Sequence, residues 1–436
     1  MQSSLPKVLH PIGGQPLLAH VIAAAQGLQP EKIHVIHGYQ AEHVRAACAH
    51  LDVHWVYQDK PSGTAHAVQQ ALPCIPDDAR VLVLCGDNPL ISTETLAQLS
   101  EGLSDKTIGL LTAVLDDPRK LGRIIRDANQ QVAGIVEYKD ADLKQRNIQE
   151  INSGIMNFPV TFLKQAIPLL QNNNAQQEYY LTDCIAVAVQ RGLTIKAIQT
   201  PTPQEVQGVN DKQELALMER AYQAKQVEKL MQAGATVLDP ARVDVRGEVT
   251  VAEDVTIDIN VIFEGKVTLG KGCKVGANCI LKNVTVGDNT EILPNSLIED
   301  SQIGESCRVG PFARLRPGTV LHDQVRVGNF VETKKADIGE GSKINHLSYI
   351  GDTIMGANVN VGAGTITCNY DGVNKFVTTI QDGAFIGSNT CLIAPVTIGE
   401  NAMTGAGSTI SKDAPADALT LSRAPQKILK NWKRPS

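Results

Sequence analysis

The stretch Val267-Thr-Leu-Gly-Lys-Gly-Cys-Lys-Val-Gly-Ala-Asn-Cys-Ile-Leu281 decides the fold, because an apolar residue returns in it at every sixth position. Leu269, Val275 and Leu281 hold those positions, and Gly directly follows the first two. The same interval, with occasional steps of five, continues through most of the second half of the chain. The series is Val251, Ile257, Phe263, Leu269, Val275, Leu281, Val286, Ile292, Ile298, Ile303, Val309, Leu315, Leu321, Val327, Ile338, Ile344, Ile350, Ile380, Ile386, Leu392 and Ile398.

A period of six predicts a solenoid of short strands. One apolar side chain from each strand points inward and stacks on its counterpart in the next coil, while Gly lets the chain turn the corners. An α-helix would need a period of about 3.6 residues and would not tolerate this density of Gly. A Gly-rich β-sandwich is the alternative, but it gives no reason for so regular a spacing. The repeat breaks between Val361 and Ile380, where we expect an expelled loop that carries binding groups.

The first half of the chain alternates predicted strands and helices, which favours an α/β domain with a mostly parallel sheet. The expected strands are 33–36, 54–57 and 80–85, and the expected helices are 17–25, 41–49 and 63–71. A long amphipathic helix from Asp211 to Ala233 follows, capped by Asn210 or Asp211 and ended by Gly234. The predicted divisions are a first domain at 1–210, a linker helix at 211–234, and the solenoid with a C-terminal tail at 235–436.

The composition is ordinary for a soluble protein and excludes several classes. The net charge is −6, and no block is strongly basic, which argues against nucleic-acid binding. No run of about 18 apolar residues predicts a membrane span, and no apolar segment near Met1 predicts a secretory signal. The nine Cys lack any Cys-x-x-Cys pair, as is typical of reduced, buried thiols in a cytoplasmic protein. Cys273 and Cys279 follow the repeat spacing, so we expect neither a metal site nor a disulfide there.

Gly86-Asp87 directly follows the predicted strand 80–85. A carboxylate at the carboxyl edge of a parallel sheet lies where open α/β sheets bind ligands, and it would suit a metal ion bound to nucleotide phosphates. Gly-Asp is also a common turn pair, so the dipeptide alone leaves both interpretations open.

A series of longer motifs carries a family resemblance over nearly the whole chain. In the first half they are Leu5-Pro-Lys-Val-Leu-His-Pro-Ile12, Gly63-Thr-Ala-His-Ala67, Gly86-Asp87, Leu121-Gly-Arg-Ile124, Ile135-Val-Glu137, Ile151-Asn-Ser-Gly-Ile155, Glu178-Tyr-Tyr-Leu-Thr-Asp183 and Gly208-Val-Asn210. In the second half they are Gly310-Pro-Phe-Ala-Arg-Leu-Arg-Pro-Gly318, Gly328-Asn-Phe-Val-Glu-Thr-Lys-Lys335 and Gly362-Ala-Gly-Thr-Ile-Thr-Cys-Asn-Tyr-Asp-Gly372. Together they resemble the bacterial bifunctional N-acetylglucosamine-1-phosphate uridyltransferases / glucosamine-1-phosphate acetyltransferases.

This resemblance implies a fold and two activities. The fold would be a Rossmann-like nucleotidyltransferase domain followed by a left-handed parallel β-helix with three hexads per coil. The first reaction would transfer acetyl from acetyl-CoA to glucosamine-1-phosphate. The second would transfer uridylyl from UTP to N-acetylglucosamine-1-phosphate and release pyrophosphate, for peptidoglycan and lipopolysaccharide synthesis. The resemblance also implies a cytoplasmic homotrimer with acetyl-CoA sites between neighbouring subunits.

In the first half, the resemblance places Mg²⁺ on Asp87 and Asn210, a pair that suits a hard cation shared with substrate phosphates. Lys7 would neutralise phosphate charge. The residues implied for uracil are Gln58, Gly63 and Thr64. Those implied for the amino sugar are Gly122, Glu137, Asn152 and Tyr180, with Thr182 nearby. The positions that depart from the family pattern are Pro61, Cys85 and Leu121.

In the second half, the resemblance makes His346 the general base. The substrate amine is largely protonated at neutral pH, and a well-placed base is worth about 10²–10⁴ in rate. Arg316 and Lys334 would bind the sugar phosphate, and Lys375 in the expelled loop would add a third cation. Tyr349 and Asn360 would hold sugar hydroxyls. The residues implied for acetyl-CoA are Ala363, Asn369, Tyr370, Ser388, Ala406 and Arg423.

One part of the family pattern is not in this sequence. The family carries a strand and a Leu-x-x-Gly-x-Gly-Thr-Arg-Met loop ahead of Leu5-Pro-Lys, and here Met1 stands where the Met of that loop would be. We therefore expect the first, central strand to be missing and uridylyl transfer to be impaired in the chain as given. Two alternatives stay open: another sugar-phosphate nucleotidyltransferase with a regulatory β-helix, which would lack His346, Lys375 and Arg423, and a non-enzymatic trimeric scaffold.

Overall fold

A computed structural model describes residues 1–435 and divides the chain into two compact units, Met1–Tyr222 and Gln223–Ser436. The division falls within helix α8 (Lys212–Gln232). Asp211 caps this helix, because its carboxylate accepts hydrogen bonds from the backbone N–H groups of Gln213 and Glu214 at 2.9 and 2.8 Å. Within the described residues, no helix is both long enough and apolar enough to cross a membrane.

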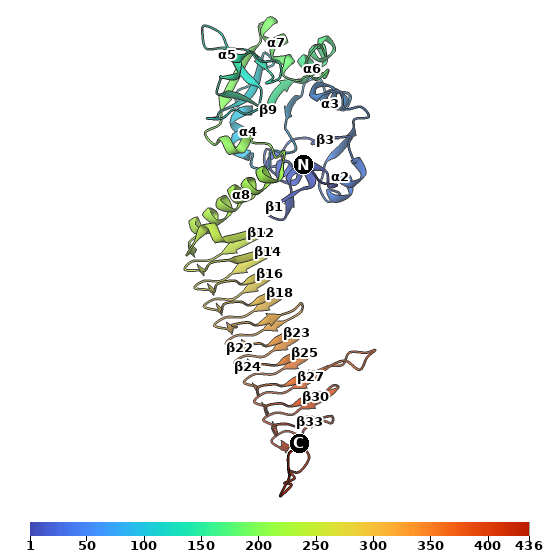
Figure 1. Cartoon of the computed structure of the whole chain (residues 1–436), viewed down its shortest axis with the longest axis vertical. Coiled ribbons are helices and arrows are strands. Elements are labelled where there is room, and N and C mark those ends of the chain that lie inside the picture. Colours follow the sequence, from blue (N-terminus) through green and yellow to red (C-terminus); the bar gives the residue numbers. More distant parts are fainter. Residues whose placement is uncertain (436) are drawn as a thin grey trace. The chain divides into compact units, whose positions relative to one another are not determined.

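The first unit contains a six-stranded sheet and a separate pair of strands, with helices around them (Figure 1). The sheet strands are β5 (Arg80–Val83), β6 (Thr107–Val114), β7 (Arg123–Arg126), β8 (Val132–Val136), β9 (Glu150–Pro159) and β10 (Thr194–Gln199). The separate strands are β3 (His34–His37) and β4 (His54–Tyr57), and a short hairpin joins β1 (Pro11–Ile12) to β2 (Gln15–Pro16). The α-helices are α1 (Leu17–Gln26), α2 (Ala41–Ala47), α3 (Thr64–Ala71), α4 (Thr93–Ser100), α5 (Leu143–Arg146), α6 (Val160–Ala166) and α7 (Asp183–Gln190).

The expectation of a mostly parallel sheet is wrong for this unit, because the sheet is mixed. Its order is β10-β6-β9-β7-β8, and β5 pairs with the same β9. Only β10 and β6 pair in parallel, whereas β9 runs antiparallel to β5, β6 and β7. The chain reverses at β9, which is buried along most of its length between β5 and β6. The alternation of strands and helices therefore identified the α/β class but not this reversed strand.

Strands β3 and β5 each have one edge without a neighbouring strand among residues 1–435. β3 pairs only with β4, in parallel, and β5 pairs only with β9. The apolar β5 is half-buried at every position, although it continues into the Gly86-Asp87 turn. An apolar strand with an open edge is typical of a sheet interior rather than of a natural edge.

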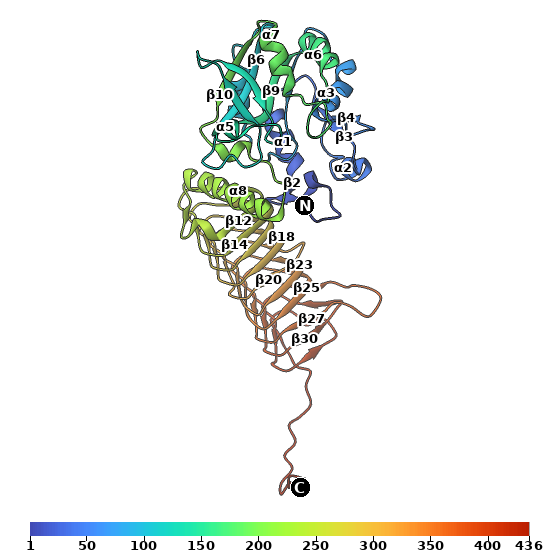
Figure 2. The same ribbon diagram turned by 45° about the horizontal axis from the view of Figure 1, so that its top comes forward.

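The second unit is a stack of parallel coils, the left-handed β-helix of hexapeptide repeats that the resemblance implied (Figure 1, Figure 2). Equivalent residues of successive coils are 17 or 18 positions apart: Ile257 pairs with Val275, and Val275 pairs with Ile292. Every residue of the predicted apolar series is buried in one continuous core except Val251, which is half-buried and packs against it. The predicted inward stacking is therefore confirmed.

Two long sheets run along this stack. One contains β11 (Thr236–Val237), β13 (Thr256–Ile257), β15 (Lys274–Val275), β17 (Glu291–Ile292), β19 (Arg308–Val309), β22 (Arg326–Asn329), β24 (Lys343–His346), β26 (Asn360–Val361), β29 (Phe385–Ile386), β32 (Met403–Thr404) and β34 (Leu419–Thr420). The other contains β12 (Val243–Val251), β14 (Val261–Leu269), β16 (Ile280–Val286), β18 (Leu297–Ile303), β20 (Arg314–Leu315), β21 (Val320–Leu321), β23 (Glu332–Ile338), β25 (Tyr349–Met355), β27 (Ile366–Cys368), β28 (Thr378–Ile380), β30 (Cys391–Ile393), β31 (Val396–Ile398) and β33 (Thr409–Ile410).

Most of the Gly residues that follow the inward apolar residues do not have the backbone conformation expected of a corner; Gly310, with φ 104°, is an exception. They were expected to turn the corners, yet Gly276 and Gly287 have ordinary φ angles, and Asn residues such as Asn289 take the left-handed conformation with φ 55°. A Cβ on Gly287 would lie 2.6 Å from the carbonyl carbon of Gly304 in the next coil. These Gly residues are thus required by the close approach of adjacent coils.

The expelled loop is present where the repeat breaks. It lies between β27 and β28, carries an antiparallel bridge between Tyr370 and Lys375, and projects away from the stack in both views (Figure 1, Figure 2). Its insertion lengthens one coil, so that Val361 pairs with Ile386.

The nine cysteines are all free thiols. Cys273 and Cys279 are buried in the solenoid core, and burial raises the pKa of Cys279 to about 11. The expectation of buried thiols is wrong for Cys74, which is exposed.

We predict that Gly287→Ala destabilises the solenoid by about 1–3 kcal/mol, because the added methyl group has no room against the next coil. The matched control is Asn289→Gly, two residues away, which keeps the left-handed conformation accessible and should change stability by only a few tenths of a kcal/mol. Thermal unfolding followed by calorimetry on the full chain measures both. Equal midpoints for the two variants would contradict the close-approach explanation.

Candidate active sites

Lys7, Asp87 and Asn210, which the resemblance assigned to phosphate and metal binding, meet in the first unit. The Lys7 ammonium lies 2.5 Å from Asp87 Oδ2 and donates a hydrogen bond to Asn210 Oδ1 at 2.8 Å. The backbone holds this arrangement, since the N–H of Val209 donates to the carbonyl of Asp87 at 3.1 Å. Gly208 permits the approach, because a Cβ there would lie 3.1 Å from Asp87 Oδ2.

The donor set fits a hard cation. One carboxylate oxygen and one amide oxygen converge on a single positively charged nitrogen, and Mg²⁺ prefers oxygen ligands of these two kinds. Among residues 1–435, no three His, Cys, Asp or Glu side chains are grouped to hold a metal ion. A Mg²⁺ ion here would therefore take most of its ligands from water and substrate phosphates, and it would compete with Lys7 for the same two oxygens.

The three residues predicted for uracil lie together at the start of α3. Gly63 caps the helix with φ 112°, and a Cβ there would meet the backbone carbonyl of Tyr179 at 2.5 Å. Gln58 donates to the Gly63 carbonyl at 3.5 Å and contacts His66 at 2.9 Å. Thr64 accepts a hydrogen bond from the N–H of Leu181 at 2.9 Å, which ties this segment to the residues predicted for the sugar.

The residues predicted for the amino sugar also form one cluster. Thr182 donates to Glu137 at 3.2 Å, and a Cβ on Gly122 would lie 3.3 Å from the same carboxylate. The N–H of Asn152 donates to the carbonyl of Gly122 at 2.9 Å. Glu137 and Tyr180 line a hollow of about 330 Å³. Burial is the main cause that raises the pKa of Glu137, and the Thr182 hydrogen bond opposes it.

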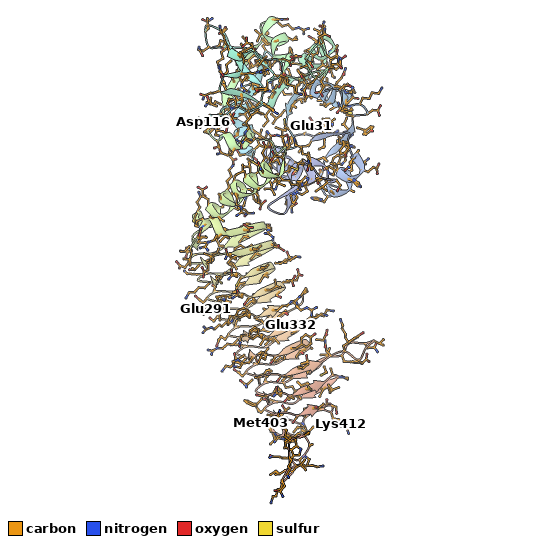
Figure 3. All side chains as sticks on the ribbon, in the orientation of Figure 1. Glu31, Asp116, Glu291, Glu332, Met403 and Lys412 are labelled. Atoms are coloured by element: carbon orange, nitrogen blue, oxygen red, sulfur yellow. The ribbon has the colours of Figure 1, made fainter. Side chains whose placement is uncertain are left out.

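In the second unit, Arg316, Lys334 and Lys375 form a cluster of three cations. Lys375 lowers the pKa of Lys334 by direct contact and by charge repulsion, and Arg316 adds to this repulsion. Glu332, labelled in Figure 3 on the outer surface of the solenoid, accepts a hydrogen bond from Arg316 at 2.8 Å. Tyr349 pairs in register with Glu332. Like charges held together in this way create a site for a multiply charged anion such as a phosphate.

His346 ends β24, just before a corner formed by Leu347, and Tyr349 begins the strand on the other side of that corner. The imidazole is exposed, and its Nδ1 lies 3.3 Å from Oδ1 of Asn329, which is its register partner on β22. The predicted base and the cation cluster with Tyr349 therefore lie on the two sides of one corner of the solenoid.

Three of the residues predicted for acetyl-CoA continue the column that His346 begins. The residue after each donates its N–H to the column member one coil earlier: Gly364 to His346, Asn389 to Ala363, and Gly407 to Ser388. Ala363, Ser388 and Ala406 thus stack below the base, and Arg423 closes the column by donating to the Ala406 carbonyl at 3.0 Å. Small side chains leave room along this edge for an extended ligand.

Three further predicted residues lie outside the column, and one of them, Tyr370, pairs with Lys375 of the cation cluster through the antiparallel bridge of the expelled loop. Asn360 pairs in register with Lys343 and Phe385 on the sheet of β24, rather than with the cation cluster. Asn369 donates a short hydrogen bond to Asp352. The Tyr370 hydroxyl donates to the Gly372 carbonyl within the expelled loop at 2.5 Å.

The sequence analysis missed Glu332, Asp352 and Asn329. Each contacts a predicted residue from roughly one coil away, since Glu332 is 16 positions after Arg316 and Asn329 is 17 positions before His346. The spacing of one coil was visible in the apolar series, so a search at 16 to 18 positions from each candidate would have found all three.

Comparisons with known proteins find relatives for both halves of the chain. Family models match at residues 1–179 (MobA-like NTP transferase domain), 245–338 (GMPPB C-terminal domain) and 378–412 (Bacterial transferase hexapeptide, six repeats). The bifunctional protein GlmU of Marinobacter nauticus is 53% identical over 435 residues, which are 100% of this chain and 96% of that protein. Those of Alkalilimnicola ehrlichii and Legionella pneumophila are each 52% identical and match 100% of this chain and 94% and 96% of their own lengths.

A solved nucleotidyl transferase from Methanothermobacter thermautotroptrophicus aligns with a TM-score of 0.36 and 15% identity. The alignment covers 50% of this chain and 85% of that one.

We predict that the affinity of the cation cluster for inorganic phosphate falls as the pH rises through the lowered pKa of Lys334, because the anion binds the protonated amine. Titration calorimetry between about pH 8 and pH 10.5, where phosphate keeps one charge state, measures this. Lys334→Met should bind more weakly and show a flatter pH dependence, while Lys343→Met on the neighbouring sheet should behave like the unaltered chain. An unchanged pH dependence in Lys334→Met would refute the prediction.

Proposed function

Because this chain belongs to the family of the bifunctional GlmU proteins, we propose that it makes UDP-N-acetylglucosamine in two steps. The solenoid transfers acetyl from acetyl-CoA to glucosamine-1-phosphate, and the first unit transfers uridylyl from UTP to the N-acetylglucosamine-1-phosphate so formed. The observation that carries the proposal is the corner at Leu347, where the cation cluster lies on one side and His346, with the column of small residues below it, on the other.

In the acetyl step, the phosphate of glucosamine-1-phosphate binds Arg316, Lys334 and Lys375, which fixes the sugar with its amine towards the corner. His346 takes a proton from the amine, whose nitrogen attacks the thioester carbonyl. A C–N bond forms and the C–S bond breaks, and the proton passes from the imidazole to the leaving thiolate of CoA. The edge formed by Ala363, Ser388 and Ala406 holds the acyl donor, with Arg423 available for its phosphates.

In the uridylyl step, a phosphate oxygen of N-acetylglucosamine-1-phosphate displaces pyrophosphate from the α-phosphorus of UTP. Gln58, Gly63 and Thr64 hold the uracil, and the cluster around Glu137 holds the amino sugar. Lys7 neutralises phosphate charge. Mg²⁺, when bound to Asp87 and Asn210, supplies further charge neutralisation for the triphosphate. Positioning of the two substrates dominates the rate of such reactions.

The corner that carries Leu347 supports assembly of the chain into a homotrimer. At this corner other coils place Asn or Gly in the left-handed conformation, but three successive coils place Phe312, Phe330 and Leu347 there, with φ of 54°, 55° and 48°. These side chains are 50–61% exposed, and the two rings stack with centroids 5.4 Å apart. Large apolar residues in this conformation cost of order 1–3 kcal/mol each, so contact with a second copy accounts for them.

The two alternative functions, a nucleotidyltransferase with a regulatory β-helix and a non-enzymatic scaffold, predict different residues at these sites. A nucleotidyltransferase with a purely regulatory β-helix would have no reason to bring three cations and a histidine to one corner. A scaffold would have no reason to keep Lys7, Asp87 and Asn210 within hydrogen-bond distance of one another.

We predict that His346→Ala lowers kcat for CoA release by about 10²–10⁴, with little change in KM for acetyl-CoA, because the base acts only when the amine attacks. A thiol-detecting assay of CoA release with glucosamine-1-phosphate measures this, and His322→Ala serves as the matched control. Pyrophosphate release on the same preparation reports the second step. Near-normal CoA release by His346→Ala would refute the assignment of the base.

We also predict that Phe330→Asp dissociates the trimer, because it places a charge in the middle of the apolar corner. Sedimentation velocity at micromolar chain concentration measures the change. Asn278→Asp, at the same corner of an earlier coil, should leave assembly intact. A Phe330→Asp chain that stays trimeric would show that this corner does not mediate assembly.

A further inference from the structure

We propose that Asn329 is a positioning residue for the acetyl transfer: it fixes the tautomer of His346 so that Nε2 is the atom that accepts the amine proton. The inference rests on the proposed function and adds a residue to it. Asn329 and His346 end neighbouring strands β22 and β24 and pair in register, with Asn329 Oδ1 3.3 Å from His346 Nδ1.

The backbone brings the two side chains together. A Cβ on Gly328 would clash with the backbone of Asn345, so the coils approach most closely one residue before the Asn329–His346 pair. One residue after it, the N–H of Leu347 donates to the Asn329 carbonyl at 3.1 Å. Contacts between the same two coils therefore hold the Asn329–His346 pair on both sides.

An amide in this place has a defined chemical effect. An amide oxygen can only accept, so it selects the imidazole tautomer that carries its proton on Nδ1 and leaves the lone pair of Nε2 free. Because the amide is neutral, it does not favour the charged imidazolium as a carboxylate would. The next residue in the column, Ala363, offers only a methyl group, so Asn329 is the one side chain that hydrogen-bonds this ring among the described residues.

The second unit contains a second histidine whose neighbour differs from that of His346. This other histidine, His322, lies 2.8 Å from a carboxylate oxygen of Asp337. The charged groups on the strands around His346 are Arg326 on β22 and Lys343 on its own strand, and β26 carries none. Across the corner, β23 carries Glu332, Lys334, Lys335 and Asp337, and β25 carries Tyr349 and Asp352. None of these residues pairs in register with His346, whereas Asn329 does.

Two variants of the full chain separate positioning from packing. Asn329→Leu keeps the volume but removes the acceptor, and it should lower kcat about tenfold or more at every pH while both KM values stay within about twofold. Asn329→Asp keeps an acceptor and adds a charge that favours the imidazolium. Its acid limb of kcat/KM should therefore move up by about one pH unit or more, with turnover restored on the alkaline plateau.

A measurement without substrate makes the test independent of activity. Diethylpyrocarbonate modifies only unprotonated imidazole, and peptide mass spectrometry can follow His346 and His322 separately across pH. Asn329→Asp should raise the midpoint of His346 modification and leave that of His322 unchanged. Asp337→Asn, the matched control, should leave the midpoint of His346 modification unchanged.

The outcomes are distinguishable. If the unaltered chain releases no CoA, the proposed function fails, and the modification midpoints still report on the Asn329–His346 contact. If Asn329→Leu turns over normally, or if Asn329→Asp leaves both the midpoint of His346 and the acid limb unmoved, the positioning role is overturned. Equal losses in the two variants at all pH values, with an unmoved midpoint, would likewise overturn it and indicate packing alone.

Discussion

The inward stacking of one apolar side chain on its counterpart in the next coil is the interaction on which the second unit depends. Ile344, for example, is buried between Val327 above it and Val361 below it. Once these residues are in register, every outward position is in register too, because the strand direction and spacing are fixed. Residues 17 or 18 positions apart in the sequence therefore become neighbours in adjacent coils. Outward-facing side chains at equivalent positions of successive coils lie next to one another along the surface.

The candidate acetyl site follows from that constraint. Asn329, His346, Ala363, Ser388 and Ala406 are distant in the sequence but adjacent at one edge, each hydrogen-bonded through the backbone of the next coil. The expelled loop adds what the repeat cannot, because it carries Lys375 back to Arg316 and Lys334. In the first unit, contacts between segments distant in the sequence bring the predicted site residues together. Gly63 and Thr64 contact the Tyr179–Leu181 segment, and Lys7 binds both Asp87 and Asn210.

Periodicity alone predicted the solenoid and its core, since the buried series consists of the residues spaced at six. Periodicity did not predict why Gly follows them, because the close approach of Gly287 to Gly304, which leaves no room for a Cβ, exists only between coils that are already stacked. The antiparallel β9 was also missed, because strand direction is a tertiary property that local pattern does not encode. Site residues such as Gln58 and Ser388 came from the family resemblance, since nothing in their local sequence marks them, whereas Asn329 and Glu332 could have been found from the coil spacing.

The most direct test of this account is a crystal structure of the chain with glucosamine-1-phosphate bound. The account predicts the phosphate among Arg316, Lys334 and Lys375, and the amine at the Leu347 corner within about 3.5 Å of a nitrogen of the His346 imidazole. A sugar phosphate bound away from the three cations, or an amine that points away from His346, would contradict it.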